Sequence, residues 1–510
     1  MAATAAHSGA LPLASFKDIL AYPGLAGYVA SFLPMRRGSD CSAQAFAATC
    51  WAAADACVRA SNARLVPWAI VRHAGGSSAL DLGAPVCVAS TVMAWVGGAS
   101  NTPPAFRHLR PVCPPDQAIP AGITALIIAG VPGLHRLPSL PDSMLHIQLA
   151  ACGDLEELGD RLPAQLLSLH VEQCHHLPTF TGSLPSSLRK LTVQSCASLH
   201  GLPATLPAML EEMAVISCQL VREIPSLPDS LRVLRLSSTR IPWLEAGLPT
   251  GLQQLDLSHS AELARLPACL PPGLLHLNLR DCVRLAALPD CLPGALQTLA
   301  ISRCRELRHF SHSLPSTLQR LEISAFPEHW VLPSCLQCLS FVKTGQLKQL
   351  PCALPDGLLE LQLISCRELQ ALPAPLPVHL RTLILAGLVV LKELPDVWPA
   401  QLQVLRVQQL RSMHRLPAAL PAQLQCLQVH DCSQLDVLPE ELPRHLRTLR
   451  VSRCSLIQAL PSYPPALQML DIQHCKQLRS LPEPRPATLT QVHVTGCQWL
   501  EDEGQDVLPA

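Results

Sequence analysis

The sequence predicts an α/β-type solenoid with a parallel concave sheet, an extended or polyproline-like convex side, and a small helical N-terminal domain. Two observations support this prediction. From 119 to about 500, the phrase Leu-Pro-x-x-Leu-x-x-Leu-x-Leu-x-x-Cys-x-x-Leu recurs about 18 times with a period near 22 residues. Residues 1–118 lack the phrase and are rich in alanine. Because a single repeat cannot bury its own apolar face, similarity at a fixed period predicts stacked units rather than one globular core.

Each repeat predicts one short strand. In the repeat that starts at Leu270, alternation places Leu274, Leu277 and Leu279 inward, and Cys282 turns inward behind them. Strands of successive repeats then stack in parallel at roughly 4.8 Å.

Most cysteines occupy one position of the repeat, which we call the cysteine slot. A small, largely apolar thiol suits a buried corner where the chain leaves the strand. Because other repeats place Thr, Ser, Phe or Leu there, the slot indicates packing rather than catalysis. Its cysteines are Cys152, Cys174, Cys196, Cys218, Cys282, Cys304, Cys366, Cys432, Cys454, Cys475 and Cys497.

The segments that return from one strand to the next carry paired prolines, such as Pro203 and Pro207. These prolines exclude a long helix and predict an extended convex side. One repeat, 314–331, is about four residues shorter than the others and has Phe326 in the cysteine slot, with Trp330 nearby. We expect an irregular turn there.

The phrase resembles the leucine-rich repeat over about three quarters of the chain. The 22-residue unit with its Leu-Pro pairs is similar to the short repeats of bacterial effectors of the YopM and IpaH type, which carry Asn where this chain carries Cys. The cysteine slot resembles repeats of eukaryotic F-box proteins, whose units are longer. The resemblance implies a scaffold that binds a protein or peptide on its concave face, and leaves the lineage open.

The N-terminal region resembles a divergent F-box, which implies docking to a Skp1-like adaptor of an SCF-type ubiquitin ligase. In this sequence Cys and Trp are adjacent, and the loop at 35–38 is longer than the family pattern. The alternative is a helical cap over the first repeat. The residues that carry the resemblance are Tyr22, Pro23, Phe32, Leu33, Cys50, Trp51 and Trp68.

Four segments follow from these patterns: 1–72 as the F-box-like or capping domain, 73–118 as a connector and N-terminal cap, 119–500 as the solenoid, and 501–510 as an acidic C-terminal cap. Residues 1–22 lack the basic and long apolar regions of a signal peptide. No apolar stretch reaches the ~18 residues of a membrane span. With 22 cysteines, the chain fits a reducing, cytoplasmic location.

The outward positions of the predicted strands are the candidate binding site. Arginine is prominent among them, and arginine is enriched at protein interfaces. We therefore expect a polar protein or peptide partner. The candidate contact residues are His170, Lys190, Arg235, His276, Arg280, Arg320, Glu322, Glu360, Arg406 and Arg450.

Other functions receive little support. Lys plus Arg equals Asp plus Glu, 38 each, which argues against nucleic-acid and membrane-surface binding. The Cys335-x-x-Cys338 pair lacks two further ligands, Cys174 is committed to the core beside two histidines, and His146 and His170 form at most a pair. No catalytic motif occurs, so we expect no enzyme activity, metal or cofactor. The sequence predicts a binding scaffold, as an SCF substrate receptor, a bacterial-effector-like protein that engages host proteins, or a purely structural repeat.

Overall fold

The structure of the chain is a computed structural model. It describes residues 123–497, except 132, 160, 181–182, 245–246, 328–329, 346 and 351–353, and the backbone of two strands before them. The chain divides into two compact units, Met1–Leu234 and Arg235–Ala510.

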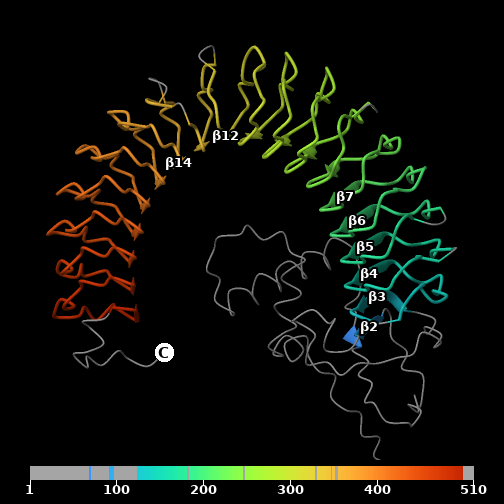
Figure 1. The fold of residues 1–510 in the computed structure, drawn as a ribbon, viewed down its shortest axis with the longest axis horizontal. Helices are drawn as coiled ribbons and strands as arrows, with labels where there is room; N and C mark the ends of the chain where they lie inside the picture. The colour runs from blue at the N-terminus through green and yellow to red at the C-terminus, as the bar shows by residue number, and fades with distance from the viewer. Residues whose placement is uncertain are drawn as a thin grey trace, which may run out of the picture. The chain divides into compact units, whose positions relative to one another are not determined.

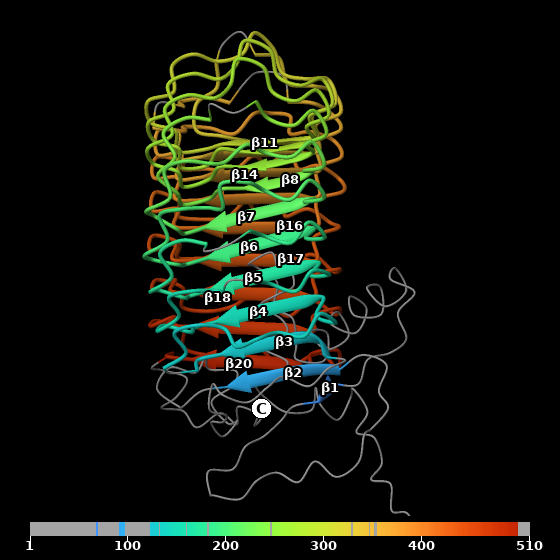
Figure 2. The ribbon, with the colours of Figure 1, turned by 90° about the vertical axis from the view of Figure 1, so that its right-hand side faces the viewer.

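The first unit contains parallel strands that pair in chain order, each with the next (Figure 2). The sheet thus begins upstream of position 119, with β1 in the segment 1–72 that was expected to be helical and β2 in the segment 73–118 that was expected to be a connector and cap. The strands are β1 (Trp68–Ala69), β2 (Thr91–Val96), β3 (Ile123–Ala129), β4 (His146–Ala150), β5 (Ser168–Glu172), β6 (Lys190–Gln194) and β7 (Glu212–Ile216). Strand β8 (Val233–Arg235) contains the division between the units.

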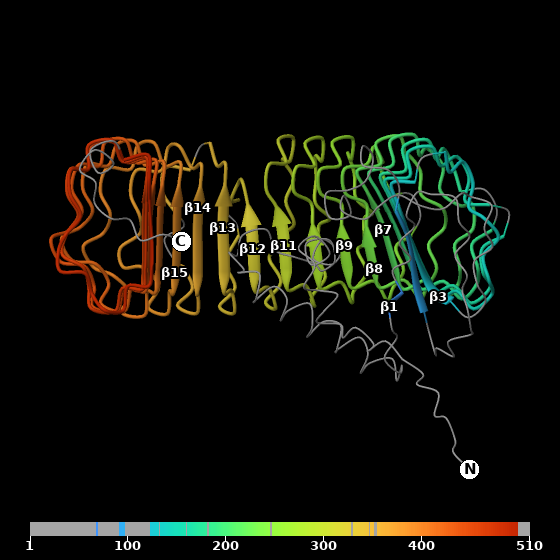
Figure 3. The same cartoon turned by 90° about the horizontal axis from the view of Figure 1, so that it is seen from below.

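In the second unit the strands also pair in parallel and in chain order (Figure 3). They are β9 (Gln254–Asp256), β10 (His276–Asn278), β11 (Thr298–Ile301), β12 (Arg320–Ile323), β13 (Cys338–Val342), β14 (Glu360–Ile364), β15 (Thr382–Ala386), β16 (Val404–Gln408), β17 (Cys426–His430), β18 (Thr448–Ser452), β19 (Met469–Gln473) and β20 (Gln491–Thr495).

Alternate residues of these strands form the core, as the Leu-x-Leu pattern predicts. In β14, Leu361 and Leu363 are fully buried and pair with equivalent residues of the neighbouring strands. Burial of each such leucine contributes about 2 kcal/mol of transfer free energy. The parallel solenoid with turns of leucine-rich-repeat type is therefore confirmed.

The return segments line the side of each unit opposite the strands (Figure 1). No helix occurs among the described residues, which confirms the extended backbone that the prolines predict. The second Leu-Pro pair of a return segment also begins a turn, because its proline carbonyl accepts a hydrogen bond from the amide of the leucine three residues later. One example is Leu188 N to Pro185 O, 3.1 Å. The turn directs the chain into the next strand.

The cysteines of the slot are buried except Cys304, which is partly exposed, and their Sγ atoms donate to backbone carbonyls, as Cys282 does to Leu257 O at 3.1 Å. Where the slot holds a hydroxyl, the same kind of bond forms: Thr239 and Ser260 both donate to Leu236 O at 2.9 Å. Burial raises the pKa of Cys304 to about 11. These contacts assign the slot a packing role with one local hydrogen bond.

The residue before the slot adopts a left-handed conformation in most turns, a feature that the sequence analysis missed. Fourteen of these residues are not glycine, with φ between 53° and 64°. The conformation lets the amide reach the neighbouring turn, as in Ser195 N to Ile216 O at 2.8 Å. The hydrogen bond that this amide donates to the neighbouring turn offsets the usual cost of about 1–2 kcal/mol for a positive φ.

The short repeat keeps the sheet register. Arg320 of β12 pairs with Cys338 of β13 only 18 residues later, without a register shift. Trp330 fills the shortened return segment and is 3% exposed. Its ring lies edge-on to Phe310 at 5.4 Å between centroids, and its Nε1 donates to Ser311 O at 2.8 Å. The expected irregularity therefore lies in the return segment and not in the sheet.

Candidate functional site

The candidate site is the outward side of the strands, which we call the open face. It consists of the first, third and fifth residues of each five-residue strand, which alternate with the buried leucines. Most of these side chains are half-buried by their neighbours within the sheet. The open face is thus a surface of ordered side chains on a rigid backbone.

All ten predicted contact residues lie on or next to this face. Third positions hold His170, Glu322, Arg406 and Arg450, and Arg235 ends the short strand β8. First positions hold Lys190, His276, Arg320 and Glu360, and Arg280 follows β10 by two residues. His170 and Lys190 belong to the first unit and the other eight to the second.

Several of these charges are neutralised within the face. Lys190 Nζ lies 2.7 Å from Glu212 Oε2, and Arg450 Nε lies 3.8 Å from Asp471 Oδ2. Gln362 donates to Glu360 Oε1 at 2.6 Å. An exposed pair such as Lys190–Glu212 stabilises the fold by less than about 1 kcal/mol. Such pairs fix the positions of the side chains more than they stabilise the chain.

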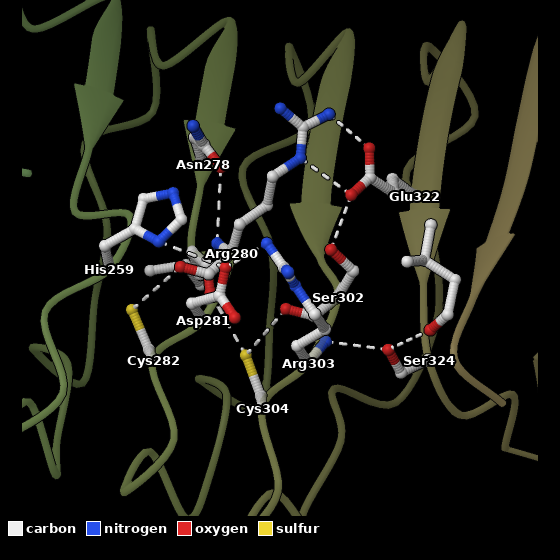
Figure 4. A network of polar contacts seen from close by, with 12 residues as sticks. His259, Asn278, Arg280, Asp281, Cys282, Ser302, Arg303, Cys304, Glu322 and Ser324 are labelled. Carbon is white, nitrogen blue, oxygen red and sulfur yellow. Dashed lines mark hydrogen bonds and ion pairs between the residues drawn. The ribbon is translucent and has the colours of Figure 1, made fainter. Parts of the chain in front are cut away.

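The densest polar contacts lie across β10 to β13 (Figure 4). Arg280 binds Glu322 through both Nε, at 2.7 Å, and a terminal nitrogen, and the Ser302 hydroxyl donates to the same carboxylate. On the adjoining edge, Asp281 accepts from the Arg303 guanidinium and lies 3.1 Å from His259 Nδ1. In this network, Arg280 and Glu322 thus form an ion pair with each other.

The sequence analysis did not name Ser302 or Asp281 as parts of the site. The sequence did contain a signal for them. Both are polar residues two to three positions after the third residue of their strand, a place where the residue type varies between neighbouring repeats. His276 is also modified by its surroundings, because burial and the guanidinium of Arg320 lower its pKa. At neutral pH this histidine adds no positive charge to the face.

Arg406 differs from Arg280 and Arg450, which pair with carboxylates. Its neighbours in register are Ile384 of β15 and Gln428 of β17. Within the described part of the chain, no carboxylate pairs with Arg406, and its buried Nε has no hydrogen-bond partner. This guanidinium is therefore a cation in an uncharged part of the open face.

The residues considered as metal ligands have other roles. Cys335 Sγ donates to Ser316 O at 2.6 Å, whereas Cys338 stands on the open face beside Glu360. Cys174 fills the core, while His170 Nε2 lies 3.6 Å from Glu172 Oε2 and pairs in register with Gln148, not with His146. Among the residues with described positions, no group of three or more His, Cys, Asp or Glu side chains could hold a metal ion.

The residues of the F-box resemblance, Tyr22 to Trp51, lie outside the described residues, as does the acidic segment 501–510. Of Trp68, only the backbone is described, in strand β1. In the described part of the chain, no helix has the length and hydropathy that a bilayer span requires.

Comparison with known proteins gives matches at the level of structure. No protein-family model matches the chain, and no curated protein matches its sequence. YopM from Yersinia enterocolitica WA-314 is 27% identical over 75% of this chain and 85% of its own, with a TM-score of 0.46. CroV588, a circular leucine-rich repeat protein, is 18% identical over 80% and 66%, with a TM-score of 0.46. The leucine-rich repeat domain of the type III effector XCV3220 (XopL) is 25% identical over 36% and 74%, with a TM-score of 0.30. These structures to which the chain is similar are leucine-rich repeat proteins.

Proposed function

We propose that this chain is a non-enzymatic scaffold that holds a protein partner on its open face and acts in the cytoplasm. The observation that supports this function is the open face itself, an ordered set of outward side chains that follows the strands turn by turn. The 16 cysteines in the described part of the chain are all free, which fits a reducing compartment.

The size of the open face suits a protein. Strands β9 to β20, at roughly 4.8 Å apart and about 16 Å long, cover on the order of 800 Å². A stable interface uses about 800 Å² of each partner. The mixture of Arg406, Arg450 and Asp471 with Ile384 and Thr448 combines polar and apolar contacts, as protein interfaces do.

A photo-crosslinking residue tests which side of the chain binds. We expect the amino acid to capture a defined set of proteins from positions Thr382, Val404 or Thr448 of the open face. The controls are Val397 and Val437, which are exposed on the return segments, 73% and 56% respectively. We expect these positions to capture the same proteins at least fivefold less. Equal capture from both sides, or capture from the return side alone, would refute the proposed function.

For the N-terminal region we propose a more specific role, docking to a Skp1-like adaptor, which would make the chain a substrate receptor of an SCF-type ligase. The support is the pattern of residues around Tyr22-Pro23, Phe32 and Trp51. We expect the full chain to bind a Skp1-type adaptor in a pull-down with purified proteins. The variant Phe32→Asp/Trp51→Ala should lose this binding by at least tenfold, because apolar contacts anchor such helices.

The control for this experiment is the fold of the repeats. The double variant should keep the wild-type hydrogen-exchange protection of β4 to β7, since it changes no residue of the solenoid. Absence of adaptor binding by the folded wild-type chain would reject the receptor role. The scaffold role would not depend on that result.

A further inference from the structure

Two neighbouring features distinguish this part of the second unit: the outward residues of β15, β16 and β17, and the turns that follow β14, β15 and β16. The first is electrostatic. Among the outward residues of β15, β16 and β17, all of which are described, Arg406 is the only Arg, Lys, Asp or Glu. Arg450, two strands away, is paired with Asp471, whereas no carboxylate pairs with Arg406 among the described residues.

The second difference is a surface hollow of about 660 Å³ at the ends of β14, β15 and β16. Val389 and Val390 lie in it and are 40% and 42% exposed, at a place where the previous turn has the charged pair Arg367 and Glu368. Arg411 lines the hollow from the next turn. Val389 and Val390 thus give the hollow an apolar part, and its charged lining is two arginines against one glutamate.

Gly387 lines this hollow and contributes to its shape. Its φ is +66°, like that of the other residues before the slot, but those residues are not glycine in most turns. A Cβ here would lie 3.3 Å from both Cα and Oγ of Ser365. The slots of this turn and the next hold Leu388 and Leu410 in place of cysteine. Glycine thus lets the turn of β15 lie close to that of β14 and lines the hollow without a side chain.

The two features are near each other along one strand. Arg406 is the third residue of β16, and Gln409, which lines the hollow, follows three residues later. At about 3.3 Å per residue of extended chain, this separation is about 10 Å. An extended segment of four residues is long enough to contact both.

We propose that the turns of β14 to β16 bind an extended, acidic segment of the protein partner. A carboxylate of the segment binds Arg406, and an apolar side chain about 10 Å along the segment enters the hollow over Val389 and Val390. The arginines Arg367 and Arg411 favour further acidic residues beside the apolar one. This inference depends on the proposed function, because it names the part of a partner that the scaffold recognises.

The chemistry of the two features favours a peptide over other ligands. The Arg406 guanidinium, with which no carboxylate pairs among the described residues, gains a charge-assisted hydrogen bond from a carboxylate of the ligand. A polyanion such as a nucleic acid would require a wider basic surface than one arginine on the strands and two at their ends. The exposed valines in turn favour a ligand that has apolar side chains.

The test uses the folded full chain and a display library of random 12-residue peptides. We expect the selected peptides to be enriched in Asp or Glu at a fixed spacing from an apolar residue. The dissociation constant of a selected peptide, measured by fluorescence polarisation, should rise at least tenfold in Arg406→Gln and at least fivefold in Val389→Ser/Val390→Ser. Arg406→Lys should keep part of the affinity, because lysine retains the charge and loses the planar fork.

The control is Arg450→Gln, on the same face two strands away, which should change the dissociation constant less than twofold. Selected peptides without acidic residues, unchanged affinity in Arg406→Gln, or no selected peptide at all would overturn the inference. Self-association of the chain that Arg406→Gln abolishes would assign the surface to a second copy and overturn it as well. Crosslinked partners on the open face that are insensitive to Arg406→Gln would reject this inference and leave the proposed function intact.

Discussion

Replacement of Trp330 by alanine is expected to lower the free energy of unfolding by about 3–5 kcal/mol, as for other large buried aromatic side chains. Trp330 is 3% exposed and takes the place of residues that the short repeat lacks. The substitution removes the edge-on contact with Phe310, a second aromatic contact with Phe326, whose centroid lies 6.2 Å away, and the hydrogen bond to Ser311 O. Truncation therefore leaves a cavity and an unpaired carbonyl in the same place.

The same substitution at Trp243 is the control. Trp243 lies on a return segment of the same unit, is 53% exposed, and should cost less than about 1 kcal/mol when replaced by alanine. Because turns of a solenoid contact only their neighbours, the loss at Trp330 is local. Urea unfolding should therefore be combined with hydrogen exchange, in which β12 and β13 lose protection first. Equal effects of the two substitutions would show that Trp330 does not support the short turn.

The short turn also shows what sequence can predict about this fold. Buried residues recur at the same positions of every repeat, so inward residues such as Leu361 and Cys282 could be assigned from their spacing alone. The spacing could also show that four residues were missing near Trp330. The spacing could not show whether the shortening lies in the strand or in the return segment, because strand pairing and aromatic packing both constrain this stretch of backbone. In the structure the ladder is retained.

The left-handed residues before the slot had no residue-type signal. Ala151, Gln173, Ser195 and Arg303 all adopt this conformation, although alanine and arginine seldom do. The conformation follows from the exit of the chain out of a parallel strand, where an amide must reach the next turn. Backbone geometry of this kind leaves the side chain free to vary, so no preference for glycine appears in the sequence.

The candidate site could be predicted by position but not by pairing. Alternation assigned Arg280, Glu322 and Arg406 to one face. It could not show that Arg280 and Glu322, 42 residues apart, bind each other across an intervening strand. It could not distinguish Arg406 from Arg450 either, because the difference is the presence of Asp471 on the adjacent strand. Side-chain length and the register of neighbouring strands decide which arginines are available to a partner.

Alkaline pH is expected to destabilise the solenoid through the buried thiols. Burial raises the pKa of Cys304 to about 11, from 9.0 in an exposed chain, and it also raises the pKa of Cys282 and Cys366. The unfolded chain therefore loses the Cys304 proton at a lower pH than the folded chain does. The stability that the neutral thiol contributes is complete below about pH 9 and is lost as the pH rises through about 11. At pH 10.5 this loss amounts to about 2 kcal/mol for Cys304 alone.

The variant Cys304→Thr isolates this contribution, because threonine occupies the slot at Thr239 and Thr344, where it is buried. We expect the free energy of unfolding in urea to fall between pH 8 and pH 10.5 by about 2 kcal/mol less in Cys304→Thr than in the wild type. Lysine and tyrosine titrate equally in both chains, so the difference reports the slot. The exposed Cys291 is the control, and Cys291→Thr should keep the wild-type pH dependence. Identical pH dependence in Cys304→Thr and the wild type would mean that the slot thiol ionises as it does in the unfolded chain. Burial by the neighbouring turns would then be weaker than the packing of the cysteine slot indicates.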